Sequence, residues 1–100
     1  MPVDQSQIDF DSAVLQISGA GFEILNKVYH PEAFGSWYIT VAAKEGRRRL
    51  IWDGKEAWFV IDHKPGRVTR EDWSGWTVQW YRWARDGVTV DDAVAAFLQG

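Results

Sequence analysis

Four segments rich in β-branched and aromatic residues, separated by short turn signals, constrain the fold of this chain most strongly. Such residues are favoured in strands because they pack well on a pleated surface. Before the fourth segment, Asp53-Gly54 is a strong hairpin signal, since both residue types tolerate the positive φ angles of a type I′ turn. The sequence therefore predicts a four-stranded antiparallel sheet. Its strands span residues 22–30, 37–44, 47–52 and 56–63.

The turn pairs at 45–46 and 53–54 predict a register for the last three strands. If each pair is a two-residue loop, Leu50 lies opposite Val41 in one hairpin and opposite Ala57 in the other. Successive side chains of a strand point to opposite faces, so these pairings also sort the residues into two faces. We expect the core face to carry Trp37, Ile39, Val41, Leu50, Trp52, Ala57, Phe59 and Ile61.

A helix is expected before the predicted sheet, over residues 9–19. Its apolar side chains recur at i, i+3, i+4 and i+7, which places them on one helical face. Asp9 or Asp11 can cap its start, because a short acidic side chain accepts hydrogen bonds from the first free N–H groups of a helix.

Two further helices are expected after the sheet. Over residues 70–86 the tryptophans recur at helical spacings of 3, 4 and 3. Over residues 90–99 the helix start is marked by Thr89 and Asp92, which can form a capping box. The tryptophans of the first segment are Trp73, Trp76, Trp80 and Trp83.

A strand remains an alternative for part of residues 70–86. Trp76, Val78 and Trp80 alternate, and the β-branched Thr77 and Val78 favour extended backbone. We favour the helix because its period accounts for four tryptophans. The predicted fold is thus a single α+β domain over residues 1–100, with a four-stranded antiparallel sheet, one N-terminal helix and two C-terminal helices.

The composition excludes several classes of protein. Hydrophobic residues make up 46% of the chain and charged residues 25%, as in globular rather than disordered proteins. There is no cysteine, which excludes disulfides, thiolate nucleophiles and cysteine-based metal sites. The start shows no signal-peptide pattern, and no apolar stretch is long enough to span a membrane. We expect a cytoplasmic protein with no membrane association.

No catalytic or metal-binding pattern is recognisable in the sequence. His30 and His63 are the only imidazoles, and neither lies in a His-x-x-x-His or His-Glu-x-x-His spacing. Phosphate-binding glycine loops and the Gly-x-Ser-x-Gly elbow are also missing. We therefore predict a protein that is not an enzyme, with no catalytic residues, no metal and no cofactor.

The non-core face of the predicted sheet is the candidate binding surface. It mixes aromatic, apolar and charged side chains, and Trp, Tyr and Arg are enriched in the hot spots of protein interfaces. In the predicted register Arg49 lies opposite Trp58, so its guanidinium could stack on the indole. Alternatively, the N-terminal or the last helix covers this face. We expect the partner-binding residues on this face and its hairpin turn to be Tyr38, Arg49, Ile51, Asp53, Glu56 and Trp58.

Three stretches of the sequence carry a resemblance to known proteins. They are Gly21-Phe22-Glu23-Ile24, Tyr29-His30-Pro31-Glu32-Ala33-Phe34-Gly35-Ser36-Trp37, and Leu50-Ile51-Trp52-Asp53-Gly54 with Trp58 after it. The pattern resembles small immunity-type proteins found beside bacterial polymorphic and contact-dependent toxins. This resemblance implies a protein that binds and blocks a cognate toxin domain, often a nuclease, and that has no catalytic residues. The basic run at 47–49 departs from the acidic surface expected of a nuclease mimic.

These observations lead to two functional hypotheses. The first is an immunity-like protein that neutralises a toxin domain through protein–protein binding. The alternative is a small nucleic-acid or nucleotide-binding module that uses the Arg47–Arg49 hairpin and the aromatic sheet face. The formal net charge of −3 argues against the second, because nucleic-acid-binding domains are usually basic. Neither hypothesis specifies an oligomeric state.

Overall fold

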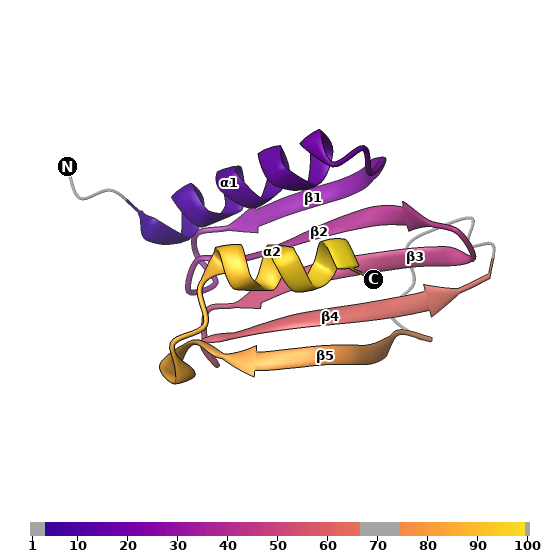
Figure 1. Ribbon diagram of the computed structural model, residues 1–100. Coiled ribbons are helices and arrows are strands. Elements are labelled where there is room, and N and C mark those ends of the chain that lie inside the picture. Colours follow the sequence, from indigo (N-terminus) through magenta and orange to yellow (C-terminus); the bar gives the residue numbers. More distant parts are fainter. Residues whose placement is uncertain (1–3, 67–74, 100) are drawn as a thin grey trace.

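A computed structural model describes residues 4–66 and 75–99 of the chain (Figure 1). Within these residues, two α-helices flank a run of five strands, and a short 3-10 helix precedes the second α-helix. The elements are α1 (Gln5–Gly19), β1 (Ile24–His30), β2 (Ser36–Ala43), β3 (Gly46–Asp53), β4 (Trp58–Pro65), β5 (Thr77–Trp83), η1 (Ala84–Asp86) and α2 (Val90–Gln99).

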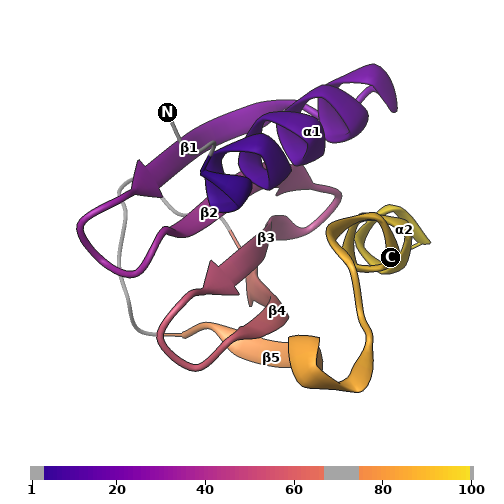
Figure 2. The same cartoon turned by 90° about the vertical axis from the view of Figure 1, so that its left-hand side faces the viewer.

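The strands form one antiparallel sheet in which each strand pairs with its neighbour in the chain, in the order β1-β2-β3-β4-β5. Such a meander needs only short connections between strands. α1 packs on β1 and β2, and α2 packs on β3 and β4. Both helices lie on one side of the sheet, here called the helix face, and the other side is called the opposite face (Figure 2).

The prediction of four strands and two C-terminal helices is wrong, although the antiparallel α+β class is confirmed. The sheet has a fifth strand, Thr77–Trp83, where a helix was predicted, and α2 is the one α-helix described after it. The first residues of that predicted helix, 70–74, lie outside the described part of the chain. The fifth strand is explained by the burial of β4, in which Phe59, Val60 and Ile61 are consecutive buried residues. The backbone of a buried strand needs hydrogen-bond partners on both edges, and β5 supplies the second edge of β4.

A β-bulge accounts for the spacing of tryptophans that suggested a helix. On β5, Val78 pairs with Asp62 and Trp80 pairs with Ile61, with the register shift between these two partners. An extra residue on one strand reverses the side-chain alternation at that point. Trp80 therefore lies on the helix face and Val78 on the opposite face, although they are separated by a single residue. Long-range pairing with β4 thus overrode the local helical period.

The hairpin registers differ from the predicted ones, but the faces do not. Leu50 pairs with Ile39 in β2 and with Ile61 in β4, rather than with Val41 and Ala57. The first partner is displaced by two residues and the second by four. Because side-chain direction has a period of two, an even displacement keeps each strand residue on its predicted face.

The β3–β4 turn is longer than the predicted type I′ turn. β3 ends at Asp53 and β4 begins at Trp58. The Asp53 carboxylate accepts hydrogen bonds from the backbone N–H groups of Lys55 and Glu56, at 3.0 and 3.2 Å. Ala57, which was predicted on the core face, closes the turn instead with a positive φ of 58°. An aspartate that bonds to the backbone two and three residues ahead is a common way to start such a turn.

The core lies between the helix face and the two helices. Trp37 and Leu50 are buried as predicted, whereas Trp52 is half-buried at the margin of the core, with its ring centroid 4.7 Å from that of Phe59. The buried apolar residues are Ala13, Ile17, Trp37, Ile39, Val41, Leu50, Phe59, Ile61, Ala93, Val94 and Phe97.

Side-chain caps define where both α-helices begin. Asp4 caps α1 by accepting the N–H of Ser6 at 3.0 Å, so this helix starts earlier than predicted and uses neither aspartate expected for the role. The predicted capping box of α2 is confirmed, because Thr89 and Asp92 exchange backbone-to-side-chain hydrogen bonds of 2.9 and 3.3 Å. In the described residues, neither helix is long and apolar enough to cross a membrane.

Leu50→Ala is expected to lower the free energy of unfolding by about 3 kcal/mol, because truncation leaves a cavity between Ile39 and Ile61. Urea unfolding followed by tryptophan fluorescence measures the loss. Leu15→Ala is the matched control, since Leu15 on α1 is 74% exposed and its truncation should cost less than about 0.5 kcal/mol. Equal losses in the two variants would contradict the central position of Leu50.

Gly54→Ala is expected to destabilise the fold through a steric overlap. The backbone of Gly54 does not have a positive φ, but a Cβ at this position would overlap the carbonyl oxygen of Phe34. Gly19→Ala is the control, because a Cβ there meets nothing within 4 Å and alanine favours a helix by about 0.5–1 kcal/mol over glycine. Thermal unfolding should therefore shift down for the first variant only; a normal melting temperature for Gly54→Ala would rule out the close approach.

Candidate functional site

The opposite face of the sheet carries an apolar pocket of about 430 Å³ beside β4 and β5. Trp58 pairs with Trp83, and Val60 pairs with Tyr81, so these cross-strand partners present their side chains on the same face. The pocket, here called the aromatic pocket, is lined by Trp58, Val60, Val78, Tyr81 and Trp83.

The three rings of the aromatic pocket contact one another. The ring centroid of Trp58 lies 4.7 Å from that of Trp83 and 5.6 Å from that of Tyr81. Val60 is buried, whereas Tyr81 is 50% exposed. The guanidinium of Arg85 lies 4.6 Å from the ring centroid of Trp83. Tryptophan, tyrosine and arginine gathered around an exposed apolar pocket are typical of interface hot spots.

β5, which supplies most of the aromatic pocket, is also an edge strand of the sheet (Figure 1). Exposed edges are usually protected by charged residues or proline, because their backbone groups can pair with another chain. β5 has the sequence TVQWYRW, with Arg82 as its single charged residue and no proline. The edge beside the aromatic pocket is therefore suited to accept the backbone of a partner.

Arg49, which was predicted to stack on Trp58, is paired with Asp62 instead. Its Nε and Nη2 atoms donate to the two carboxylate oxygens at 3.0 and 2.7 Å, and both side chains are 6% exposed. Its guanidinium also lies 4.0 Å from the ring centroid of Trp76 and 5.9 Å from that of Tyr38. The corrected register causes this pairing, since Arg49 and Asp62 are cross-strand partners. Arg49 therefore belongs to the centre of the opposite face rather than to its rim.

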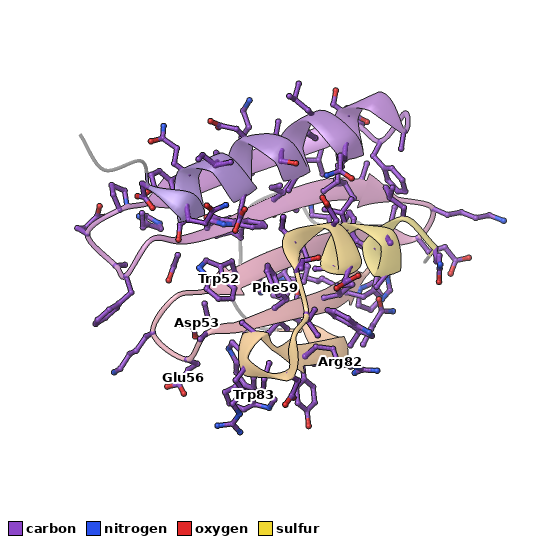
Figure 3. The ribbon with its side chains drawn as sticks, turned by 60° about the vertical axis from the view of Figure 1, so that its left-hand side comes forward. Trp52, Asp53, Glu56, Phe59, Arg82 and Trp83 are labelled. Carbon is purple, nitrogen blue, oxygen red and sulfur yellow. The ribbon has the colours of Figure 1, made fainter. Side chains whose placement is uncertain are left out.

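Of the other predicted binding residues, Trp58 lines the aromatic pocket. Tyr38 and Ile51 pair with each other and are half-buried on the opposite face. Asp53 and Glu56 lie at the β3–β4 turn (Figure 3), where the Asp53 carboxylate is engaged by the turn backbone and Glu56 is exposed. The predicted set is thus divided among three places: the pocket, the middle of the opposite face and the turn.

Val78, Tyr81 and Trp83 of the aromatic pocket were missed by the sequence analysis, because their segment was predicted to be a helix. The alternation that starts at Trp76 contained the signal for a strand. It could have placed Tyr81 and Trp83 on one face, since they are two residues apart.

The two histidines lie on different strands of the described chain. His30 lies on β1 with its Nδ1 atom 3.2 Å from the Glu32 carboxylate, and His63 lies on β4. Across residues 4–66 and 75–99, no group of three or more histidine, aspartate or glutamate side chains could hold a metal ion.

Comparisons of the chain with known protein families, curated proteins and solved structures give no match.

Asp62→Asn is expected to lower the free energy of unfolding by about 3–5 kcal/mol, because removing one partner leaves the other charge of a buried pair uncompensated. Glu32→Gln is the control, since the His30–Glu32 pair is largely exposed, at 46% and 73%, and such a pair contributes about 0–1 kcal/mol. Chemical denaturation of both variants makes the comparison. A loss for Asp62→Asn no larger than for the control would show that the pair does not stabilise the sheet.

Proposed function

We propose that this chain is a non-catalytic protein-binding module whose partner docks on the aromatic pocket and the adjoining edge of β5. The observation that carries the proposal is the packing of Trp58, Tyr81 and Trp83 around an apolar pocket of about 430 Å³. A pocket of this size accommodates one or two apolar side chains of a partner, and truncation of such anchors often removes most of the binding energy.

The solvent exposure of two apolar side chains on β5 supports the same proposal. Val78 and Tyr81 are 57% and 50% exposed, so two large apolar side chains on one strand lie partly in water. Burying them against a partner is favourable by about 25 cal/mol per Å² of apolar surface, before the costs of association. The neighbouring Arg85 lies at the rim of the pocket, where it can favour a partner with acidic groups around an apolar anchor.

The partner class that we propose is a toxin domain. This follows from the resemblance to immunity-type proteins, which act by occupying a surface of the toxin and need no reactive residues of their own. A rigid sheet that presents aromatic side chains is compatible with that role, because pre-organised rings lose little conformational entropy on binding.

The nucleic-acid alternative receives less support from the positions of its arginines. Arg48 and Arg49 are 8% and 5% exposed, and each is engaged within the protein. Contacts to the phosphates of a polynucleotide require cationic side chains that protrude into solvent, whereas a buried guanidinium is accessible only to a small group that enters its pocket. We therefore favour a protein partner over a nucleic acid.

Tyr81→Ala tests the proposal. Tyr81 is half-exposed, so its truncation should change the melting temperature little, but loss of a hot-spot anchor costs at least about 2 kcal/mol, or about 30-fold in Kd. Titration calorimetry against the protein product of the adjacent gene measures the affinity. Leu25→Ala is the matched control, because Leu25 is 43% exposed on the edge strand β1 and should leave the Kd unchanged.

Three outcomes would contradict the proposal. A toxin domain that does not bind the wild-type protein would exclude the proposed partner. An unchanged Kd for Tyr81→Ala would place the binding site elsewhere. Salt-sensitive retention on single-stranded DNA that is lost in Arg47→Gln would support the nucleic-acid alternative instead.

A further inference from the structure

A second pocket, of about 410 Å³, lies at the other end of β4 from the aromatic pocket. It is close to the turn between β2 and β3, and charged and polar side chains dominate its lining. We call it the Arg48 pocket; it is lined by Ala43, Lys44, Glu45, Arg48, His63 and Gln79.

Arg48 is the buried charge of this pocket. It lies on the helix face, where it pairs with Val41 in β2 and with His63 in β4. Its Nη1 atom donates to the backbone carbonyl of Phe97 in the last turn of α2 at 2.7 Å, and its Nε atom donates to the Gln79 side chain at 3.5 Å. The guanidinium also lies 4.7 Å from the ring centroid of Phe97.

These contacts leave the charge of Arg48 without an anionic partner in the described residues. A guanidinium has five N–H donors, and the two hydrogen bonds use only two of them. In residues 4–66 and 75–99, no carboxylate lies within ion-pair distance of Arg48. Arg48 is only 8% exposed, and burial lowers its pKa. A buried charge is costly unless an opposite charge compensates it.

Two other basic groups face the same space. His63 is the cross-strand partner of Arg48, and Lys44 lies at the β2–β3 turn, so both line the pocket beside the guanidinium. Glu45 is the one acidic residue of the lining. The pocket is therefore electropositive. It brings together the planar guanidinium of Arg48 and two further hydrogen-bond donors, the Lys44 ammonium group and the His63 imidazole.

We propose that the Arg48 pocket binds an oxyanion, the phosphate or carboxylate group of a small ligand. The guanidinium of Arg48 holds the oxyanion through N–H groups that do not bond to Phe97 or Gln79, in the forked geometry that matches carboxylate and phosphate oxygens. Lys44 and His63, which line the same pocket, supply further hydrogen-bond donors to it. The volume accommodates the oxyanion together with part of the molecule that carries it. This site is independent of the aromatic pocket.

The test is a nuclear magnetic resonance titration of the full chain with inorganic phosphate and, separately, with succinate, at constant ionic strength. Saturable shifts of the Arg48 Nε–H signal and of the Ala43 and Lys44 amides are expected. Tighter binding of phosphate assigns a phosphate ester as the ligand, and tighter binding of succinate assigns a carboxylate.

Charge variants distinguish specific binding in the Arg48 pocket from nonspecific electrostatic attraction of the anion to the protein. Lys44→Gln should weaken binding by roughly 2- to 5-fold, and Glu45→Gln should strengthen it by a similar factor, as expected for partly exposed charge pairs. Lys55→Gln makes the same charge change at the exposed β3–β4 turn and should leave the affinity unchanged. These variants keep the bond between Arg48 and Phe97, so the fold is preserved.

Arg48→Lys provides the last comparison, because lysine keeps the charge but loses the planar fork. It should weaken binding of both anions more than Lys44→Gln does. Absence of saturable shifts with either anion would overturn the proposal and leave Arg48 as a cap for the last turn of α2. Equal weakening by Lys44→Gln and Lys55→Gln would also overturn it.

Discussion

The pairing of β3 with both of its neighbours is the constraint on which the rest of the structure depends. Leu50, at the middle of β3, lies between Ile39 and Ile61 under the two helices. One residue earlier on the same strand, Arg49 lies between Thr40 and Asp62 on the opposite face. Since side chains alternate along a strand, one register fixes both the apolar core and the buried ion pair. A shift by one residue would place Arg49 in the core and Leu50 opposite an aspartate.

This shared register gives the two faces different roles. The helix face is covered by apolar side chains from α1 and α2, and the Arg48 pocket lies at its β2–β3 end. The opposite face has a charged pair at its centre and the aromatic pocket at its β4–β5 side. The two candidate sites thus lie at opposite ends of β4 and on opposite faces. Their chemistry also differs, because one is apolar and the other electropositive.

Much of the fold could be predicted because its signals are local. The start of α2 was correct, since the exchange of hydrogen bonds between Thr89 and Asp92 needs only residues three apart. The division of the central strands into faces was also correct, because alternation is a property of each strand by itself. It held even though the two-residue β2–β3 loop lies one residue earlier than predicted and the β3–β4 turn is longer than predicted. β5 was missed for the opposite reason. Whether its residues form a strand depends on pairing with β4, which is distant information for a local pattern. In addition, Trp76, Trp80 and Trp83 match a helical period by coincidence.

The sequence by itself determined which residue types are present and which residues of β2, β3 and β4 share a face. It therefore pointed to an aromatic surface that includes Trp58. Only the tertiary structure decided which charges and rings meet on that surface, because cross-strand partners are set by turn length and by the bulge in β5. Arg49 was separated from Trp58 and buried against Asp62, while Trp83 took the place beside Trp58. Contacts between distant segments follow from register, and register is a property of the assembled sheet.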